Sequence, residues 1–120
     1  MILFICAQDL NFFWLGLIKN QSLEVLEKVD SSPENILKSL DEFLRSHKFD
    51  VDQLKGVSVV SGPGSFTASR ISLIIANGLC FTKTIPLFVL ENQFNLTPKD
   101  LVRDKGVGEV DKRFEKTSQK

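Results

Sequence analysis

The chain has 120 residues, which is enough for one ordinary hydrophobic core and leaves little room for a second domain. Lysine plus arginine and aspartate plus glutamate each total 15, so the net charge is zero and no large field of one sign attracts nucleic acid or a membrane surface. The two cysteines, Cys6 and Cys80, both stand among apolar residues, which indicates buried free thiols in a reducing compartment and not a disulfide framework.

The strongly apolar segment 1–18 raises the question of a signal peptide or a membrane anchor. No lysine or arginine precedes it, polar residues between positions 8 and 11 interrupt it, and each apolar half is far shorter than the roughly 20 residues that a membrane helix needs. Two short strands, 2–6 and 12–18, explain the segment better. We therefore expect a cytoplasmic protein without a membrane segment.

The next two elements are expected to be a strand and a helix. The apolar spacing over 23–29 suggests a third strand of an antiparallel meander, although the charged residues between leave a helix open there. Asp30-Ser31-Ser32-Pro33-Glu34 predicts a helix start, with a serine as N-cap and proline in the first turn. One apolar stripe follows at helical spacing, and the helix is expected to end near 46–48; the stripe consists of Ile36, Leu37, Leu40, Phe43 and Leu44.

The central stretch of the sequence is 57–79. The β-branched run 57–60 predicts a buried strand, the Gly-Pro-Gly run after it ends that strand, and a helix is expected from about Phe66 to Phe81. Either Ser65 or Thr67 offers the side-chain oxygen that would cap this helix. Before this stretch, Asp50 and Asp52 lie in a connection, where turn formation explains them better than paired acid chemistry does.

After the central helix, the apolar run 85–90 predicts a strand, and Pro86 restricts it to a sheet edge or a strand start. From Pro98 onward the chain is rich in charge and is expected to lack a fixed structure, or to form a frayed helix near 109–116. The order β-β-β-α-β-α predicts an α/β domain with a mixed sheet over residues 1–97, followed by a tail over 98–120.

The loop between the central strand and helix is a candidate anion-binding site, because backbone amides and the positive end of the helix dipole would point the same way. Arg70 would add a phosphate contact. A structural turn that lets strand and helix pack closely is the alternative, and the P-loop lysine is missing. The residues of this candidate loop are Gly62, Pro63, Gly64, Ser65, Phe66, Thr67 and Arg70.

The central helix is apolar almost all round. Small residues form one stripe, which consists of Ser69, Ser72, Ala76 and Cys80. Two interpretations stay open: the helix is enclosed inside its own domain, or the small stripe admits a helix of a partner. In the second case, the interface residues would be Ser69, Ser72, Ile75, Ala76 and Leu79.

The sequence offers no catalytic centre and no metal site. His47 is the single histidine and is expected to be a solvated residue at a helix end. The cysteines lack a neighbouring base or metal ligands in the sequence. We expect neither an enzyme nor a cofactor.

The run Ser61-Gly62-Pro63-Gly64-Ser65-Phe66-Thr67, with Arg70-Ile71 and Gly78-Leu79 at the spacing seen here, resembles the most distinctive motif of the bacterial TsaB (YeaZ) family. The order of elements over 1–91 also resembles the N-terminal half of that family, so the resemblance implies one half-domain of the actin-like ATPase (ribonuclease H-like) fold. Members of that family are accessory proteins of tRNA threonylcarbamoyladenosine synthesis.

The resemblance implies a non-catalytic scaffold that binds a TsaD-like subunit, the enzyme that modifies adenosine 37 of tRNA, through helices of this half. A TsaE-like ATPase would join the complex, tRNA would be contacted only indirectly, and a homodimer would form when the partner is absent. The alternative function is a small nucleotide- or anion-binding protein that uses the loop 62–67. Departures from the family pattern, among them Cys6-Ala7 in place of its Asp-Thr pair, weigh against ligand binding.

Overall fold

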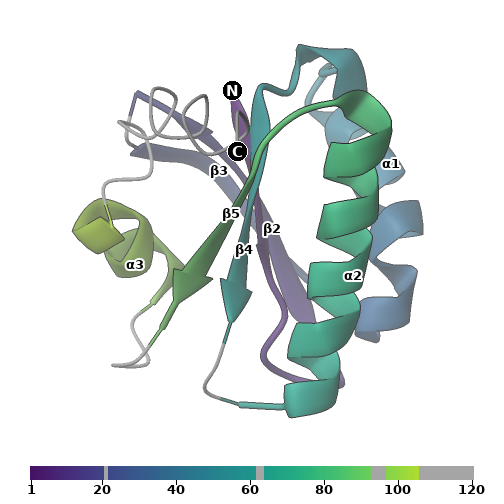
Figure 1. Ribbon diagram of the computed structural model, residues 1–120, viewed down its shortest axis with the longest axis vertical. Coiled ribbons are helices and arrows are strands. Elements are labelled where there is room, and N and C mark those ends of the chain that lie inside the picture. The colour runs from purple at the N-terminus through teal and green to yellow at the C-terminus, as the bar shows by residue number, and fades with distance from the viewer. Residues whose placement is uncertain (21, 62–63, 93–96, 106–120) are drawn as a thin grey trace.

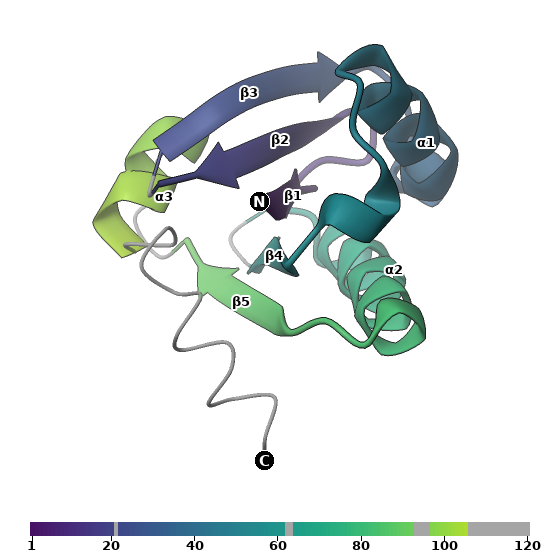
Figure 2. The ribbon, with the colours of Figure 1, turned by 90° about the horizontal axis from the view of Figure 1, so that it is seen from above.

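The computed structural model describes residues 1–20, 22–61, 64–92 and 97–105. These residues form a five-stranded sheet of strand order β3-β2-β1-β4-β5, with helices on both of its faces (Figures 1 and 2). The β-β-β-α-β-α order and the mixed α/β sheet are confirmed. No helix within the described ranges has the length and hydrophobicity to cross a membrane.

The first three strands form the predicted antiparallel meander. They are β1 (Ile2–Cys6), β2 (Phe13–Lys19) and β3 (Ser22–Val29). In the turn after β1, the Asp9 carboxylate accepts a hydrogen bond of 2.8 Å from the Asn11 amide, which is the local turn chemistry that aspartate supplies. The segment for which the sequence left strand or helix open, Ser22–Val29, is therefore a strand, because it pairs with β2 along its length.

The two remaining strands run parallel to β1. The strand β4 (Gly56–Ser61) pairs with β1, and β5 (Leu87–Glu91) pairs with β4 at the edge of the sheet. Pro86 lies just before β5, and its carbonyl oxygen accepts a hydrogen bond of 3.1 Å from the Val57 amide. The predicted edge position after Pro86 is confirmed.

The first helix begins later than the sequence predicts. A 3₁₀ turn, η1 (Pro33–Asn35), precedes α1 (Ile36–Ser46), and Ser32 makes no capping hydrogen bond through its side chain. Instead, the Asn35 side-chain amide donates to the Ser31 hydroxyl at 2.8 Å. Ser32 therefore occupies the predicted N-cap position, with Pro33 in the first turn, but the turn is 3₁₀ and the serine side chain makes no capping bond. Leu37 was also expected in the buried stripe but is 55% exposed.

The second helix, α2 (Phe66–Lys83), lies beside α1 on one face of the sheet (Figure 1). Both helices help to bury one core cluster, to which β1, β2 and β4 contribute their apolar side chains. A second 3₁₀ turn, η2 (Val51–Gln53), connects α1 to β4 and closes with a capping box between Asp50 and Gln53. Asp50 and Asp52 are thus turn residues, as predicted.

The opposite face of the sheet carries the short helix α3 (Pro98–Lys105) (Figure 2). Leu101 and Val102 are buried there in a second core cluster with Phe4, Ile18 and Leu90. The expectation that the chain lacks a fixed structure from position 98 is therefore wrong for 98–105, since this apolar pair anchors the segment to the sheet. The frayed helix expected near 109–116 lies outside the described residues.

Candidate functional site

The loop between β4 and α2 is fixed by its contact with the turn that follows β1. Gly64 has φ +119°, and a Cβ added there would lie 2.5 Å from the Gln8 carbonyl oxygen. The Ser65 amide donates a hydrogen bond of 2.9 Å to the same oxygen. Only glycine combines this backbone angle with so close an approach. Gly64 therefore has a structural role that joins the two loops at the carboxyl ends of β1 and β4.

The residues of the candidate anion site are only partly brought together. Ser65 caps α2, because its hydroxyl accepts a hydrogen bond of 3.1 Å from the Ala68 amide, and Thr67 is exposed. A hollow of about 240 Å³ lies beside this cap, lined by Ser61, Gly64, Ser65, Phe66, Ser69, Arg70 and Leu73. The Arg70 guanidinium lies 5.5 Å from the centroid of the Phe66 ring. Gly62 and Pro63 lie outside the described residues.

The face of α2 that packs on the sheet is made of small side chains. Its four buried residues are Ala68, Ser72, Ala76 and Cys80. Ser72 and Ala76 were predicted to contact a partner, but both are fully buried within this chain. That part of the predicted interface is wrong, because the small side chains let α2 approach its own sheet.

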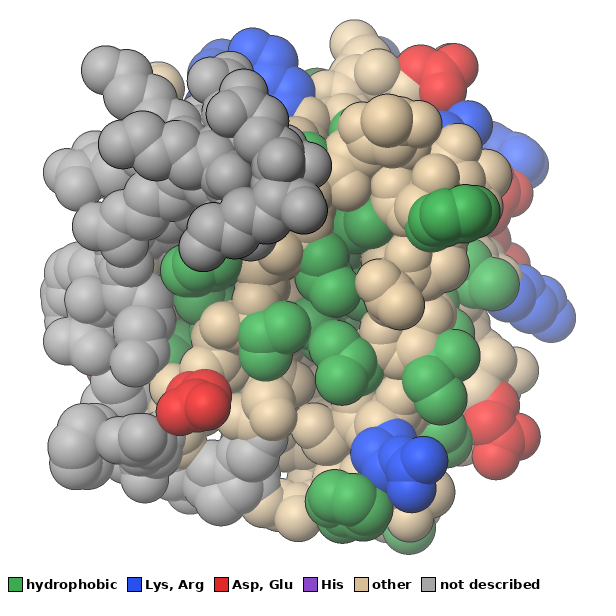
Figure 3. Space-filling model, in the orientation of Figure 1, with side chains coloured by type: hydrophobic (Ala, Val, Ile, Leu, Met, Phe, Trp, Pro, Cys, Tyr) green, Lys and Arg blue, Asp and Glu red, His purple; other side chains and the backbone are tan. Residues whose placement is uncertain are grey.

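The opposite face of α2 exposes large apolar residues. Exposure reaches 74% for Phe66, 66% for Ile74 and 88% for Phe81, and Leu73 is 37% exposed. We call this surface the outward face of α2; it consists of Phe66, Arg70, Leu73, Ile74, Asn77, Gly78 and Phe81. In Figure 3, hydrophobic side chains gather over α2 and the neighbouring β5. A row of exposed side chains this large is unusual on a chain without a partner.

The flanks of α2 lie between these two faces. Ile75 and Leu79 are partly buried against the core cluster below α1 and α2, and Ser69 is partly buried beside the hollow at the helix start. Their part in a partner interface stays a prediction. Sequence reasoning missed the outward face because both faces of α2 are apolar, although the size of the exposed side chains was a usable signal.

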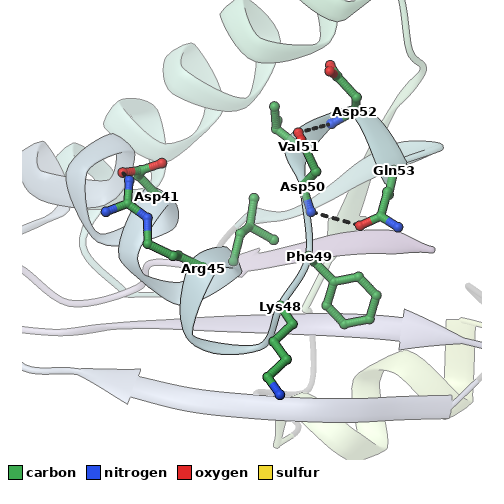
Figure 4. Close-up of a pocket in the computed structure, with 9 residues that line it drawn as sticks. Asp41, Arg45, Lys48, Phe49, Asp50, Val51, Asp52 and Gln53 are labelled. Atoms are coloured by element: carbon green, nitrogen blue, oxygen red, sulfur yellow. Dashed lines mark hydrogen bonds and ion pairs between the residues drawn. The ribbon is translucent and has the colours of Figure 1, made fainter.

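A larger hollow, of about 720 Å³, lies at the end of α1 (Figure 4). Its lining combines the last turns of α1 with the connection to β4: Asp41, Leu44, Arg45, Lys48, Phe49, Asp50, Val51, Asp52 and Gln53. Most of its charges already have partners. Arg45 lies 2.8 Å from the Asp41 carboxylate, and Asp52 lies 3.1 Å from Lys83 Nζ at the end of α2. The hollow is therefore a mixed-charge surface without an obvious ligand.

His47 lies closer to the core than predicted. Its ring packs edge-on against Phe43 at 4.9 Å between centroids, and its side chain is 27% exposed. Its Nε2 atom lies 3.3 Å from the Glu27 Oε1 atom of β3 but forms no hydrogen bond with a described residue. The expected solvated position is wrong, since the end of α1 turns this ring toward β3. Within the described ranges, no three histidine, cysteine or acidic residues gather in a way that could hold a metal ion.

The two thiols are buried and are not paired with each other. Burial raises the pKa of Cys6 from 9.0 to about 12. Burial also raises the pKa of Cys80 to about 11, and a backbone hydrogen bond from Val57 acts in the opposite direction. Both groups stay protonated at neutral pH, so neither is poised as a nucleophile.

A comparison with known protein families shows which family the chain belongs to. The family model described as "TsaD: tRNA N6-adenosine threonylcarbamoyltransferase" matches residues 29–93, which is more than half of the chain. The chain belongs to the TsaD family. The matched segment of this TsaD-family chain runs from the end of β3 to just beyond β5, and so contains both α1 and α2.

The individual proteins that the chain resembles include TsaB and YeaZ proteins. The chain is 34% identical over 59 residues to the Haemophilus influenzae protein described as "tRNA threonylcarbamoyladenosine biosynthesis protein TsaB"; the match covers 49% of this chain and 25% of that protein. The resemblance to the TsaB (YeaZ) family is thereby confirmed. The chain spans less than half the length of the TsaB and YeaZ proteins it matches.

Solved structures confirm the fold of this TsaD-family chain. YeaZ from Pseudomonas aeruginosa has a TM-score of 0.65 at 16% identity, over 75% of this chain and 43% of that one. The RuvC structure of Thermus thermophilus has a TM-score of 0.52 at 14% identity, over 75% of this chain and 63% of that one. At these identities the likeness concerns the fold alone, which is the ribonuclease H-like arrangement expected from the sequence.

Proposed function

We propose that this chain is a non-catalytic accessory protein of tRNA threonylcarbamoyladenosine biosynthesis that binds a TsaD-like catalytic subunit. The family membership and the name of the Haemophilus relative support the pathway. The observation that carries the proposal is the outward face of α2, where large apolar side chains are exposed. Binding a partner there would remove this apolar surface from water.

The corrected interface differs from the one that the sequence predicts. Phe66, Ile74 and Phe81 replace Ser72 and Ala76 as its centre. Phe66 and Phe81 are 15 positions apart, so the row is about 22 Å long at 1.5 Å per helical residue. A contact of that length along one helix fits within a standard protein–protein interface, which buries roughly 1,200–2,000 Å² of accessible surface.

The wider assembly is proposed on the family resemblance. A TsaE-like ATPase joins through the complex with the TsaD-like subunit, and the tRNA substrate, with its adenosine 37, is held by that catalytic subunit. The net charge of zero supports an indirect role toward tRNA, because this chain has no excess of cations to offer the phosphate backbone. We place the complex in the cytoplasm, where tRNA is modified.

The test measures complex formation by size-exclusion chromatography with light scattering, using this chain and the TsaD-like protein of the same genome. We expect a one-to-one complex, and we expect Ile74→Asp to abolish it while the circular dichroism spectrum stays unchanged. Ser22→Asp is the matched control, because it adds the same charge: Ser22 is exposed on the edge strand β3, at the opposite edge of the sheet from β5, and edge strands tolerate charged residues. No complex with the unmodified chain would end the proposal.

A second candidate function rests on the hollow beside the start of α2. Arg70 and three serines line it, and a nucleotide phosphate there would meet both a cation and the positive end of the helix dipole. Calorimetry with ATP and ADP tests this candidate. Micromolar binding that Arg70→Ala removes would support it, and no heat at millimolar nucleotide would exclude it.

A further inference from the structure

The C-terminal half of the outward face of α2 carries a glycine that packing within the described residues does not require. A Cβ added at Gly78 would meet no atom within 4 Å, whereas one added at Gly64 would clash with the Gln8 carbonyl. Glycine inside a helix costs about 1 kcal/mol relative to alanine. Gly78 therefore weakens α2 without a steric reason within the described residues.

Gly78 and its neighbours on the surface of α2 form a shallow hole. Ile74, Asn77, Gly78 and Phe81 occupy positions i, i+3, i+4 and i+7 of α2, and all four are exposed. Four residues with this spacing form the hole that receives one side chain of a facing helix in knobs-into-holes packing. The hole has large walls, Ile74 and Phe81, and a floor without a side chain at Gly78.

The charge on this surface restricts what can face it. The sequence of α2 contains no aspartate or glutamate, and its two cations are Arg70 and Lys83. Lys83 lies 3.1 Å from the Asp52 carboxylate, whereas the described residues place no carboxylate in an ion pair with the exposed Arg70. A partner that covers the outward face would desolvate Arg70, which is costly unless it supplies a carboxylate.

We infer that a helix of the partner crosses α2 at Gly78, inserts one large apolar side chain into the hole, and presents an acidic residue to Arg70. The inference rests on the proposed function, because it describes the surface of the TsaD-like subunit that binds here. Without a side chain at the floor, the two helix axes can approach at the short end of the 8–10 Å range of packed helices.

A second copy of this chain fits the same surface less well. If two copies packed through their outward faces, α2 of neither copy would offer an acid to Arg70 of the other. The two guanidinium groups would then be covered without ion partners from this helix, at a cost in desolvation. We therefore assign the surface to a different protein, with self-association as a distinct outcome of the test.

The experiment separates helix stability from binding at one position. Gly78→Ala should raise the melting temperature of the isolated chain by several degrees, because alanine is the better helix former. The same substitution should weaken binding to the TsaD-like subunit about tenfold, since the methyl group occupies the floor of the hole. Gly78→Leu should abolish binding. Arg70→Glu should weaken it by at least tenfold, and Arg70→Lys should weaken it less.

Lys48→Gly is the control for stability. Lys48 follows α1 with φ 62°, so glycine there should also raise the melting temperature and leave the affinity unchanged. If Gly78→Leu binds normally while Ile74→Asp does not, the helix crossing is refuted and the proposed interface stands. If the unmodified chain never binds the TsaD-like subunit, the proposed function itself fails. If the chain alone forms a dimer that Gly78→Leu dissociates and that the TsaD-like subunit does not displace, a second copy is the occupant and the inference is overturned.

Discussion

The helices α1 and α2 lie side by side on one face of the sheet but are packed in opposite ways. The buried positions of α1 hold large residues, among them Leu40 and Phe43, and most of its exposed positions are polar or charged. In α2 the buried positions hold small residues, and Phe66, Ile74 and Phe81 are exposed. The comparison teaches that α1 stabilises the domain through its large side chains, whereas α2 leaves its large side chains available for another molecule.

Two phenylalanines test this contrast most directly. Phe43→Ala should lower the free energy of unfolding by about 3–5 kcal/mol, because Phe43 is buried in the core and the substitution leaves a cavity. Phe81→Ala should change it by no more than about 0.5 kcal/mol, as expected for an exposed residue. Urea unfolding followed by circular dichroism measures both. Equal losses for the two variants would mean that the helices do not differ as described.

Enlarging a small buried residue of α2 should give the next largest effect. Ala76→Leu adds volume between α2 and the sheet, where Ala76 has no exposed surface, and should cost about 1–3 kcal/mol. Asn77→Leu, one position along on the outward face, is the matched control and should not lower stability. A stable Ala76→Leu variant would show that α2 does not need small side chains to approach the sheet.

The end of α2 offers a smaller, stabilising change. Thr84 caps the helix with φ 55°, a left-handed conformation that costs a β-branched residue about 1–2 kcal/mol. Thr84→Gly should therefore raise the free energy of unfolding by about 1 kcal/mol, which thermal unfolding would register as a higher midpoint. A lower midpoint would show that contacts of the threonine side chain outweigh the backbone strain.

A change of pH should affect stability only outside the neutral range. The folded chain raises the pKa of Cys6 from 9.0 to about 12, so the thiol favours the folded state fully below pH 9, and this contribution is lost as the pH rises from 9 toward 12. Stability measured between pH 8 and 11 should therefore fall, and Cys6→Ala should fall less steeply over the same range. Equal slopes would show that the Cys6 thiol does not contribute.

The sequence predicts most of the fold because its signals are local. A continuous apolar run defines β1 and a valine-rich run defines β4, turn residues separate the strands of the meander, and Ser65 follows a Gly-Pro-Gly run where a helix must begin. The motif around that run also leads to the correct family. Leu101 and Val102 escaped prediction because two apolar residues among charges give no clear periodicity, yet they suffice to anchor α3.

The candidate site is harder to predict than the fold. Periodicity assigns Ser72 and Ala76 to one stripe of α2 and Phe66, Ile74 and Phe81 to another, but both stripes are apolar. Which stripe faces the sheet depends on how closely helix and sheet approach, and that distance is a property of the packed core. Side chains of β1, β2 and α1 help to set it, and these elements are far from α2 in the sequence.

The position of β1 in the sheet also has a kinetic consequence. β1 pairs with β2 across a short turn, but its other edge pairs with β4, where Ile2 lies opposite Gly56. The meander can therefore form early, whereas the second edge of the most buried strand has to wait until more than fifty further residues have been synthesised. We expect the closure of this long loop to limit the folding rate, and until then the chain carries an open strand edge that other nascent chains can reach.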